Sequence, residues 1–141
     1  MTIQQAAISL GLPASTIRYY EKEGIIPPAK RDAGGRRIYS QEDVDRLIPV
    51  SCLSATGMSL KDMRIYLRQR GSEPVDQYAR TRLELIESQR KQIDRQRQLL
   101  RVRLRYLQIK ERYWKAYGEN DMKSAQKYAD EANKLVIRMQ D

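Results

Sequence analysis

The chain contains a stretch of more than 40 residues, from Val75 to Tyr117, without a single glycine or proline. Within it, apolar or small side chains recur every seven residues, at Ala79, Ile86, Ile93, Leu100, Leu107 and Trp114. This repeat predicts a long α-helix that pairs along one apolar stripe, as in a coiled coil. At about 1.5 Å per residue the helix would be about 60 Å long. Because the rest of a 141-residue chain is too small to cover such a stripe, we expect a second copy of the chain to bury it.

Signals for a helix end and for a new helix follow this stretch. Gly118 suits the end of the long helix, and Asn120-Asp121 suit the cap of another. An amphipathic pattern then continues to the end of the chain at Met122, Ala125, Ala129, Ala132, Val136 and Met139. Nearby aromatic side chains either form part of a helical core or line a ligand pocket, namely Tyr106, Tyr113, Trp114, Tyr117 and Tyr128. We therefore expect a long helix in residues 71–118 and a C-terminal helix in residues 119–141 that packs on it.

The N-terminal residues have the spacing of two short helices joined by a tight turn. Thr2 and Gln5 are placed as in a capping box, and Gly11 suits the C-terminal end of a first helix. Pro13 then suits the first turn of a second helix, which we expect to end near Glu23. Helix, turn and helix in this order form a motif that many DNA-binding proteins use.

The composition favours nucleic acid as a partner. Lys and Arg number 27 against 18 Asp and Glu, for a net charge of +9, and a basic surface attracts phosphate backbones. The chain has no His and one cysteine, Cys52, so we expect no cofactor, no metal site, no intrachain disulfide and no enzyme active site. No apolar run approaches the roughly 20 residues of a membrane span, which predicts a cytoplasmic protein without a membrane partner.

Several motifs occur together in the first half of the chain. They are the helix and turn from Ile3 to Leu12, Thr16-Ile17-Arg18-Tyr19-Tyr20-Glu21, Gly24-Ile25-Ile26, a basic wing from Arg31 to Tyr39, and Asp43-Val44-Asp45-Arg46-Leu47. In this combination the chain resembles the MerR family of bacterial transcription regulators. The resemblance implies a mainly α fold, with a winged helix-turn-helix DNA-binding domain in residues 1–70. Its short two-stranded wing would be followed by the long coiled-coil dimerisation helix and the C-terminal helix.

The resemblance also implies a way of working. An antiparallel homodimer would present two DNA-reading units with two-fold symmetry to a pseudo-palindromic site in double-stranded promoter DNA. The heptad pattern by itself allows either orientation of the two helices. Upon activation the dimer would bend and untwist the promoter, at a cost of several kcal/mol, so that RNA polymerase can use it.

Candidate DNA contacts lie on the second helix, on the wing and at the start of a later helix. They are Ser15, Thr16, Arg18, Tyr19, Tyr20, Arg36, Arg37, Tyr39 and Ser59. Arginine donates paired hydrogen bonds to a guanine edge or a phosphate, and short hydroxyls suit either acceptor. At least one ring of the adjacent tyrosines should pack on the first helix, while a hydroxyl reaches a phosphate as the resemblance implies. The alternatives are a surface ion pair for Arg18, solvated wing arginines, and a plain N-cap role for Ser59 with Asp62.

The single cysteine is the candidate sensor. Its place between the third helical segment and Gly57-Met58-Ser59 resembles the branch of the family that responds to aldehydes or other thiol-reactive electrophiles through one cysteine. Reactivity requires the thiolate, for which Arg64 and the helix start at Ser59 are candidate stabilising groups. The alternative is that Cys52 is a small buried apolar side chain. Pro49, inside the third helical segment, predicts a kink or an early end of that helix.

Two other functions fit the same residues. One is a regulator that binds an organic compound noncovalently near the long helix and the C-terminal helix, so that the response would persist in Cys52→Ser. The other is an accessory protein that bends DNA, for example at recombination sites, without sensing any signal.

Overall fold

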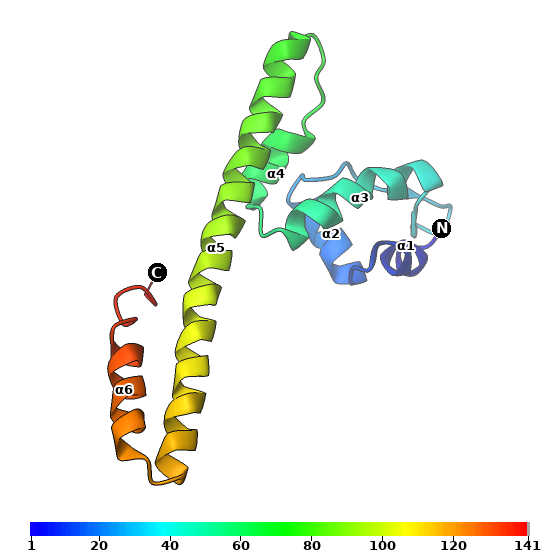
Figure 1. Ribbon diagram of the computed structural model, residues 1–141. Coiled ribbons are helices and arrows are strands. Elements are labelled where there is room, and N and C mark those ends of the chain that lie inside the picture. The colour runs from blue at the N-terminus through cyan, green and yellow to red at the C-terminus, as the bar shows by residue number, and fades with distance from the viewer. Residues whose placement is uncertain (141) are drawn as a thin grey trace. The chain divides into compact units, whose positions relative to one another are not determined.

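The computed structural model describes residues 1–140, and in this part of the chain it contains six helices and one two-stranded antiparallel sheet (Figure 1). The elements are α1 (Ile3–Leu10), α2 (Ala14–Lys22), β1 (Lys30–Arg31), β2 (Arg37–Ile38), α3 (Gln41–Ala55), α4 (Leu60–Leu67), α5 (Val75–Gly118) and α6 (Met122–Asn133). The chain divides into two compact units, Met1–Gln89 and a second unit that begins at Arg90. The mainly α fold class expected from the sequence is confirmed.

The first helix begins and ends where its capping residues predict. Thr2 Oγ1 accepts from the backbone N–H of Gln5, and Gln5 Oε1 accepts from the N–H of Thr2 at 2.8 Å, which completes a capping box. Gly11 follows with φ of +63°, a left-handed conformation that glycine adopts without steric cost. Pro13 is the N-cap of α2 and lies just before its first turn. The expected helix-turn-helix is therefore present, with each boundary within one residue of the prediction.

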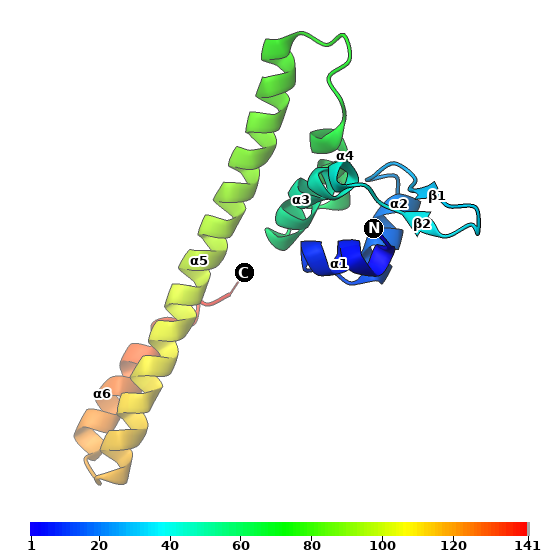
Figure 2. The same cartoon turned by 90° about the vertical axis from the view of Figure 1, so that its right-hand side faces the viewer.

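The wing is a short hairpin between α2 and α3. Figure 2 shows β1 and β2 side by side. Lys30 pairs with Ile38, and Arg31 pairs with Arg37, in antiparallel register. The carboxylate of Asp32 closes the turn, because its Oδ1 accepts from the backbone N–H groups of Gly34 and Arg36, both at 2.9 Å. An aspartate that accepts from the backbone two and four residues ahead stabilises a tight turn.

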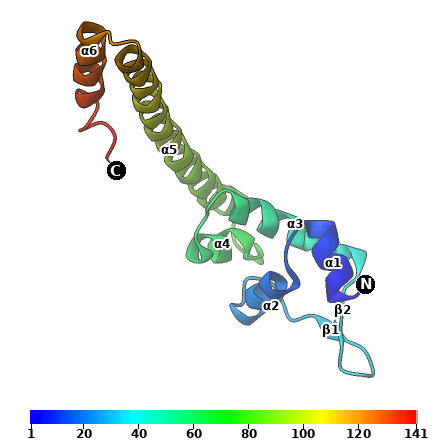
Figure 3. The same ribbon diagram turned by 90° about the horizontal axis from the view of Figure 1, so that it is seen from below.

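The core of the N-terminal unit lies between the first four helices. α1 packs on α2 and α3, and α3 packs on α4 (Figure 3). The largest fully buried side chains are Ile17, Val50 and Met63, which come from α2, α3 and α4. The core therefore fixes α2 from one face and leaves its other face in solvent.

The third helix does not end early. It continues through Pro49 to Ala55, so the expectation of an early end is wrong. Proline lacks one backbone N–H and removes one helical hydrogen bond, but the helix is stabilised by a complete capping box at Ser40 and Asp43 and by four buried side chains. These are Val44, Leu47, Val50 and Leu53.

The first turns of α5 are hydrogen-bonded to backbone carbonyls at the ends of α3 and α4. Arg82 donates to the carbonyl oxygens of Ile65 and Arg68, at 3.0 and 2.7 Å, which lie at the end of α4. Tyr78 also donates to Arg68 at 3.0 Å, and Gln89 donates to the carbonyl of Thr56 at 2.6 Å. All of these residues lie in the N-terminal unit. The start of the long helix is thus part of this unit.

In the second unit, α6 packs on the last turns of α5. Asp121 caps α6 by accepting from the N–H of Ser124, and a small core forms around Ile109, Ala132 and Leu135. Tyr106 and Tyr128 pack against this core, so these two aromatics have a core role. The C-terminal helix ends at Asn133, earlier than the expected end, although Met139 still packs on the same core. Asp141 lies outside the described residues.

The other three aromatic side chains of this region contact one another along α5. The ring of Tyr113 lies 4.9 Å from that of Trp114, and the ring of Tyr117 lies 5.5 Å from that of Trp114. Edge-to-face pairs of this kind stabilise a helix surface. Across residues 1–140, none of the helices combines the length and the apolar character of a bilayer span.

A pH-dependent contribution to stability follows from the cap of α3. Hydrogen bonds from the backbone and side chain of Ser40 lower the pKa of Asp43 below 3.8, so this contribution is present above pH 3.8 and is lost as the pH falls through the folded-state pKa. Asp43→Asn should lower the free energy of unfolding at pH 7 by about 1 kcal/mol, with a smaller difference at pH 3. Urea unfolding at both pH values measures this. Asp45→Asn, the same charge change in the next turn, is the control, and an equal loss at both pH values would contradict the assignment.

Candidate nucleic-acid interface

The second helix presents a polar face to solvent because its apolar side chains point into the core. Ile17 and Tyr20 are buried, whereas Ser15, Arg18 and Tyr19 are exposed and Thr16 is half-buried. The exposed side chains supply hydroxyl groups and a guanidinium, which suit phosphate oxygens and base edges. This face is the part of α2 that can meet DNA.

Arg18 is available for a ligand. The surface ion pair considered from the sequence does not form, because Glu21 pairs with Arg37 instead. Within residues 1–140, Arg18 makes no hydrogen bond and no ion pair of its own. A free guanidinium on an exposed helix face is ready to donate to a phosphate or a guanine.

The two adjacent tyrosines have different surroundings. Tyr20 is 5% exposed, and its hydroxyl donates to Ser54 Oγ at 2.7 Å, which joins α2 to α3. Tyr19 is 44% exposed, and its ring centroid lies 6.0 Å from that of Tyr20. Tyr20 is therefore a core residue, and its hydroxyl already has a partner on α3; the expected packing of a tyrosine ring on the first helix stays a prediction. The hydroxyl of Tyr19 is the one on the exposed side.

The wing is attached to the second helix by an ion pair. Arg37 Nε lies 3.0 Å from Glu21 Oε2, with the two side chains 27% and 14% exposed. The hydrogen bond to Glu21 raises the pKa of Arg37, and the electrostatic attraction of the same carboxylate also raises it. Arg37 thus positions the wing, while Arg36 at the tip is exposed and makes no side-chain contact within the described residues. The sequence pattern did not reveal the pairing of Glu21 with Arg37, which are 16 residues apart.

Tyr39 directly follows β2, belongs to the core of the N-terminal unit and is 5% exposed. Its hydroxyl is buried and has no hydrogen-bond partner among residues 1–140. Burial raises the pKa of Tyr39, and the nearby Glu21 carboxylate raises it further. The ring is part of the core of the N-terminal unit, so the hydroxyl is not exposed to a phosphate in this structure.

Two candidate residues around α4 make contacts within the chain, and for Ser59 such a contact leaves the predicted phosphate contact possible. Ser59 is exposed and caps α4 by accepting from the N–H of Asp62 at 3.1 Å. Arg64 donates to the backbone carbonyl of Glu23 at 3.0 Å and to its carboxylate at 3.1 Å. These bonds attach α4 to the end of α2. The Arg64 guanidinium is therefore committed to Glu23.

Cys52 lies on α3 and is exposed. The alternative that it is a buried apolar side chain is wrong for this reason. The backbone carbonyl of Cys52 accepts from the N–H of Thr56, whose own carbonyl accepts from Gln89 of α5 at 2.6 Å. The thiol is thus one helical turn away from a contact between α3 and α5.

The seven-residue stripe of α5 is uncovered. Ile86, Ile93, Leu100, Leu107 and Trp114 are 39% to 61% exposed, and Ala79 is exposed as well. Large apolar side chains in a continuous exposed row are typical of an interaction surface.

Comparison with known proteins identifies the family. A family model described as "MerR HTH family regulatory protein" matches residues 1–70. An uncharacterized HTH-type transcriptional regulator from Haemophilus influenzae is 36% identical over 94 residues, which are 65% of this chain and 67% of that protein. The HTH-type transcriptional regulator AdhR from Bacillus subtilis is 41% identical over 66 residues, so the matched part spans about half of that relative, 47% of each chain.

A solved structure agrees with these relatives. The crystal structure of HiNmlR, described as a MerR family regulator lacking the sensor domain and bound to promoter DNA, is 33% identical with a TM-score of 0.68. The match covers 89% of this chain and 94% of that one. On the evidence of the matched domain, the relatives and the shared fold, the chain belongs to the MerR family of DNA-binding transcriptional regulators.

Proposed function

We propose that the protein is a homodimeric activator that binds a pseudo-palindromic promoter, distorts its DNA and responds to a thiol-reactive aldehyde at Cys52. The observation that carries the proposal is the uncovered apolar stripe on α5, in a chain whose N-terminal unit leaves Arg18 free to contact DNA. One copy of the chain supplies one α2 helix to the DNA. Pairing of two copies through the stripe would supply two.

The stripe supports a stable pair of helices. Burying a Leu or Ile side chain contributes about 1.5–3 kcal/mol, and the row contains four such side chains as well as Trp114. Antiparallel pairing, as the family resemblance implies, would relate the two reading units by a two-fold axis. Each unit would then contact one half of a symmetric operator.

Distortion of the promoter requires a rigid connection between the reading unit and the dimer helix. The bonds from Tyr78, Arg82 and Gln89 to backbone carbonyls provide this connection on the N-terminal unit. With it, a change in the pairing of two α5 helices can turn the reading units and the DNA attached to them. Bending a promoter costs several kcal/mol, which additional phosphate contacts from α2 and the wing would supply. RNA polymerase would then engage the realigned promoter.

We infer that Cys52 starts this change, because its side chain is exposed on α3. Its thiolate would add to the carbonyl carbon of an aldehyde, which forms a hemithioacetal after the oxygen takes up a proton. The new group would stand one turn before Thr56, whose carbonyl accepts from Gln89. A bulkier side chain at this point would alter the contact between α3 and α5.

The dimer is tested by a charge on the stripe. Leu100→Lys should give a monomer at concentrations where the wild type is a dimer, because a paired lysine cannot be desolvated there. Gln98→Lys adds the same charge away from the seven-residue repeat and should leave the dimer intact. Sedimentation velocity measures both variants. A Leu100→Lys protein that remains dimeric would show that another surface pairs the subunits.

The reading helix is tested through its free arginine. Arg18→Ala should weaken binding to the promoter by roughly tenfold to a hundredfold, or about 1–3 kcal/mol. The free energy of unfolding should stay within about 0.5 kcal/mol because the side chain has no hydrogen bond or ion pair within residues 1–140. Fluorescence anisotropy with labelled promoter duplex measures the affinity. Arg80→Ala, on the exposed start of α5, is the control, and a loss of affinity equal to that of the control would remove Arg18 from the interface.

The sensor is tested by transcription in vitro from the promoter next to the gene, with and without propanal. Wild type should activate upon addition of the aldehyde, and Cys52→Ser should not, although it binds the promoter equally well. A response that persists in Cys52→Ser would favour a noncovalent organic ligand. A footprint that is the same with and without effector, found at recombination sites and absent from promoters, would favour a DNA-bending accessory protein.

A further inference from the structure

A hollow lies in the second unit, between the middle of α5 and the segment that follows α6. It has a volume of about 950 Å³, which is ample for a small organic molecule. It is lined by three arginines, four glutamines, Leu99 and Val102. No acidic side chain is among these described lining residues. The lining therefore offers many hydrogen-bond donors and an apolar floor.

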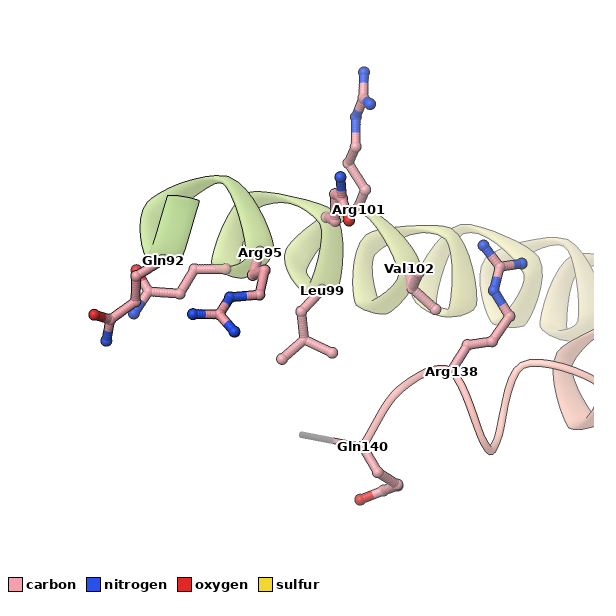
Figure 4. A pocket seen from close by; sticks show the side chains of 9 residues that line it. Gln92, Arg95, Leu99, Arg101, Val102, Arg138 and Gln140 are labelled. Carbon is pink, nitrogen blue, oxygen red and sulfur yellow. The ribbon is translucent and has the colours of Figure 1, made fainter. Parts of the chain in front are cut away.

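Two of the arginines lie on the same side of α5 as Leu99, which is part of the apolar floor. Figure 4 shows Arg95 and Arg138 on the side of α5 on which Leu99 projects, with Leu99 and Val102 between them in this view. Arg101 extends away from this side. Neither Arg95 nor Arg138 has a hydrogen bond or an ion pair with any residue in 1–140. Both guanidinium groups are therefore available to donate hydrogen bonds to a ligand.

The charge of the surroundings favours an anion. Residues 90–118 contain 10 Lys and Arg against 2 Asp and Glu, whereas residues 1–89 contain 13 against 11. Most of the excess positive charge of the chain therefore lies on this part of α5. One of the two acids, Asp94, is already paired with Arg97. A surface with this balance raises the local concentration of anions.

We propose that this hollow binds an organic dianion whose two acidic groups are separated by an apolar chain. One acid group pairs with Arg95 and the other with Arg138, because a guanidinium matches a carboxylate with two parallel hydrogen bonds. The apolar chain covers Leu99 and Val102, and Gln92 and Gln140 at the edge donate from their amide groups. The stretch of α5 from Arg95 to Val102, which holds the apolar floor, is seven residues or about 10 Å long, and the apolar chain of the ligand should have about this length to cover it. The site depends neither on the DNA contacts nor on Cys52.

The probe is nonanedioate, and isothermal titration calorimetry on the full chain measures its binding. The double variant Arg95→Gln/Arg138→Gln should weaken the affinity at least tenfold, while Arg105→Gln, a change of charge elsewhere on α5, should alter it less than twofold. Both substituted side chains are exposed, so thermal unfolding should be unchanged. The affinity should fall with added salt, as for an ion pair in solvent.

Matched ligands separate this site from a general attraction to anions. Nonanoate, with one acid group, should bind at least fivefold more weakly, and 1,9-nonanediol should not bind. Equal binding of nonanedioate by wild type and the double variant would overturn the proposal, as would equal affinity for inorganic phosphate. A further outcome is that nonanedioate fails to bind, while binding of a non-promoter duplex is lost in the double variant. That result would assign Arg95 and Arg138 to nucleic acid and would also overturn the proposal.

Discussion

The apolar stripe of α5 is the constraint on which the rest of the molecule depends. A helix of 44 residues carries Ile93, Leu100 and Leu107 in solvent, and no other part of residues 1–140 covers them. Water-exposed rows of this kind are stable only with a partner. The proposed dimer, its symmetric operator and the transmission of a signal all follow from burial of this one stripe.

Within the N-terminal unit, the internal polar contacts decide which polar side chains of α2 and the wing remain available to a ligand. Tyr20 bonds to Ser54, and Arg37 pairs with Glu21. Tyr20 and Arg37 thereby position α2 and the wing. The guanidinium groups of Arg18 and Arg36 are exposed and have no hydrogen-bond acceptor within residues 1–140. The division is physically sensible, because a reading surface must be rigid before its contacts can be selective. Tyr20 and Arg37, which the motif alone assigns to DNA, thus hold α2 and the wing in place.

Local signals in the sequence predicted the local structure well. The capping residues Thr2, Ser59 and Asp121 each begin a helix as expected, because a cap acts within three residues of itself. Partners distant in sequence were not predictable: the bond from Arg64 to Glu23 spans 41 residues and depends on how α4 packs. The continuation of α3 through Pro49 also depends on tertiary packing. The free energy gained from its buried side chains exceeds the loss of one helical hydrogen bond. The exposure of Cys52 likewise became known only from packing.

The most direct test of the account is energy transfer between dyes at the two ends of a promoter duplex, recorded as the protein is added. If a symmetric dimer distorts the DNA, transfer efficiency should change upon binding and should saturate at two protomers per duplex. The further change upon activation should have the same stoichiometry. Saturation at one protomer per duplex, or complete binding with no change in transfer with or without the aldehyde, would contradict the account.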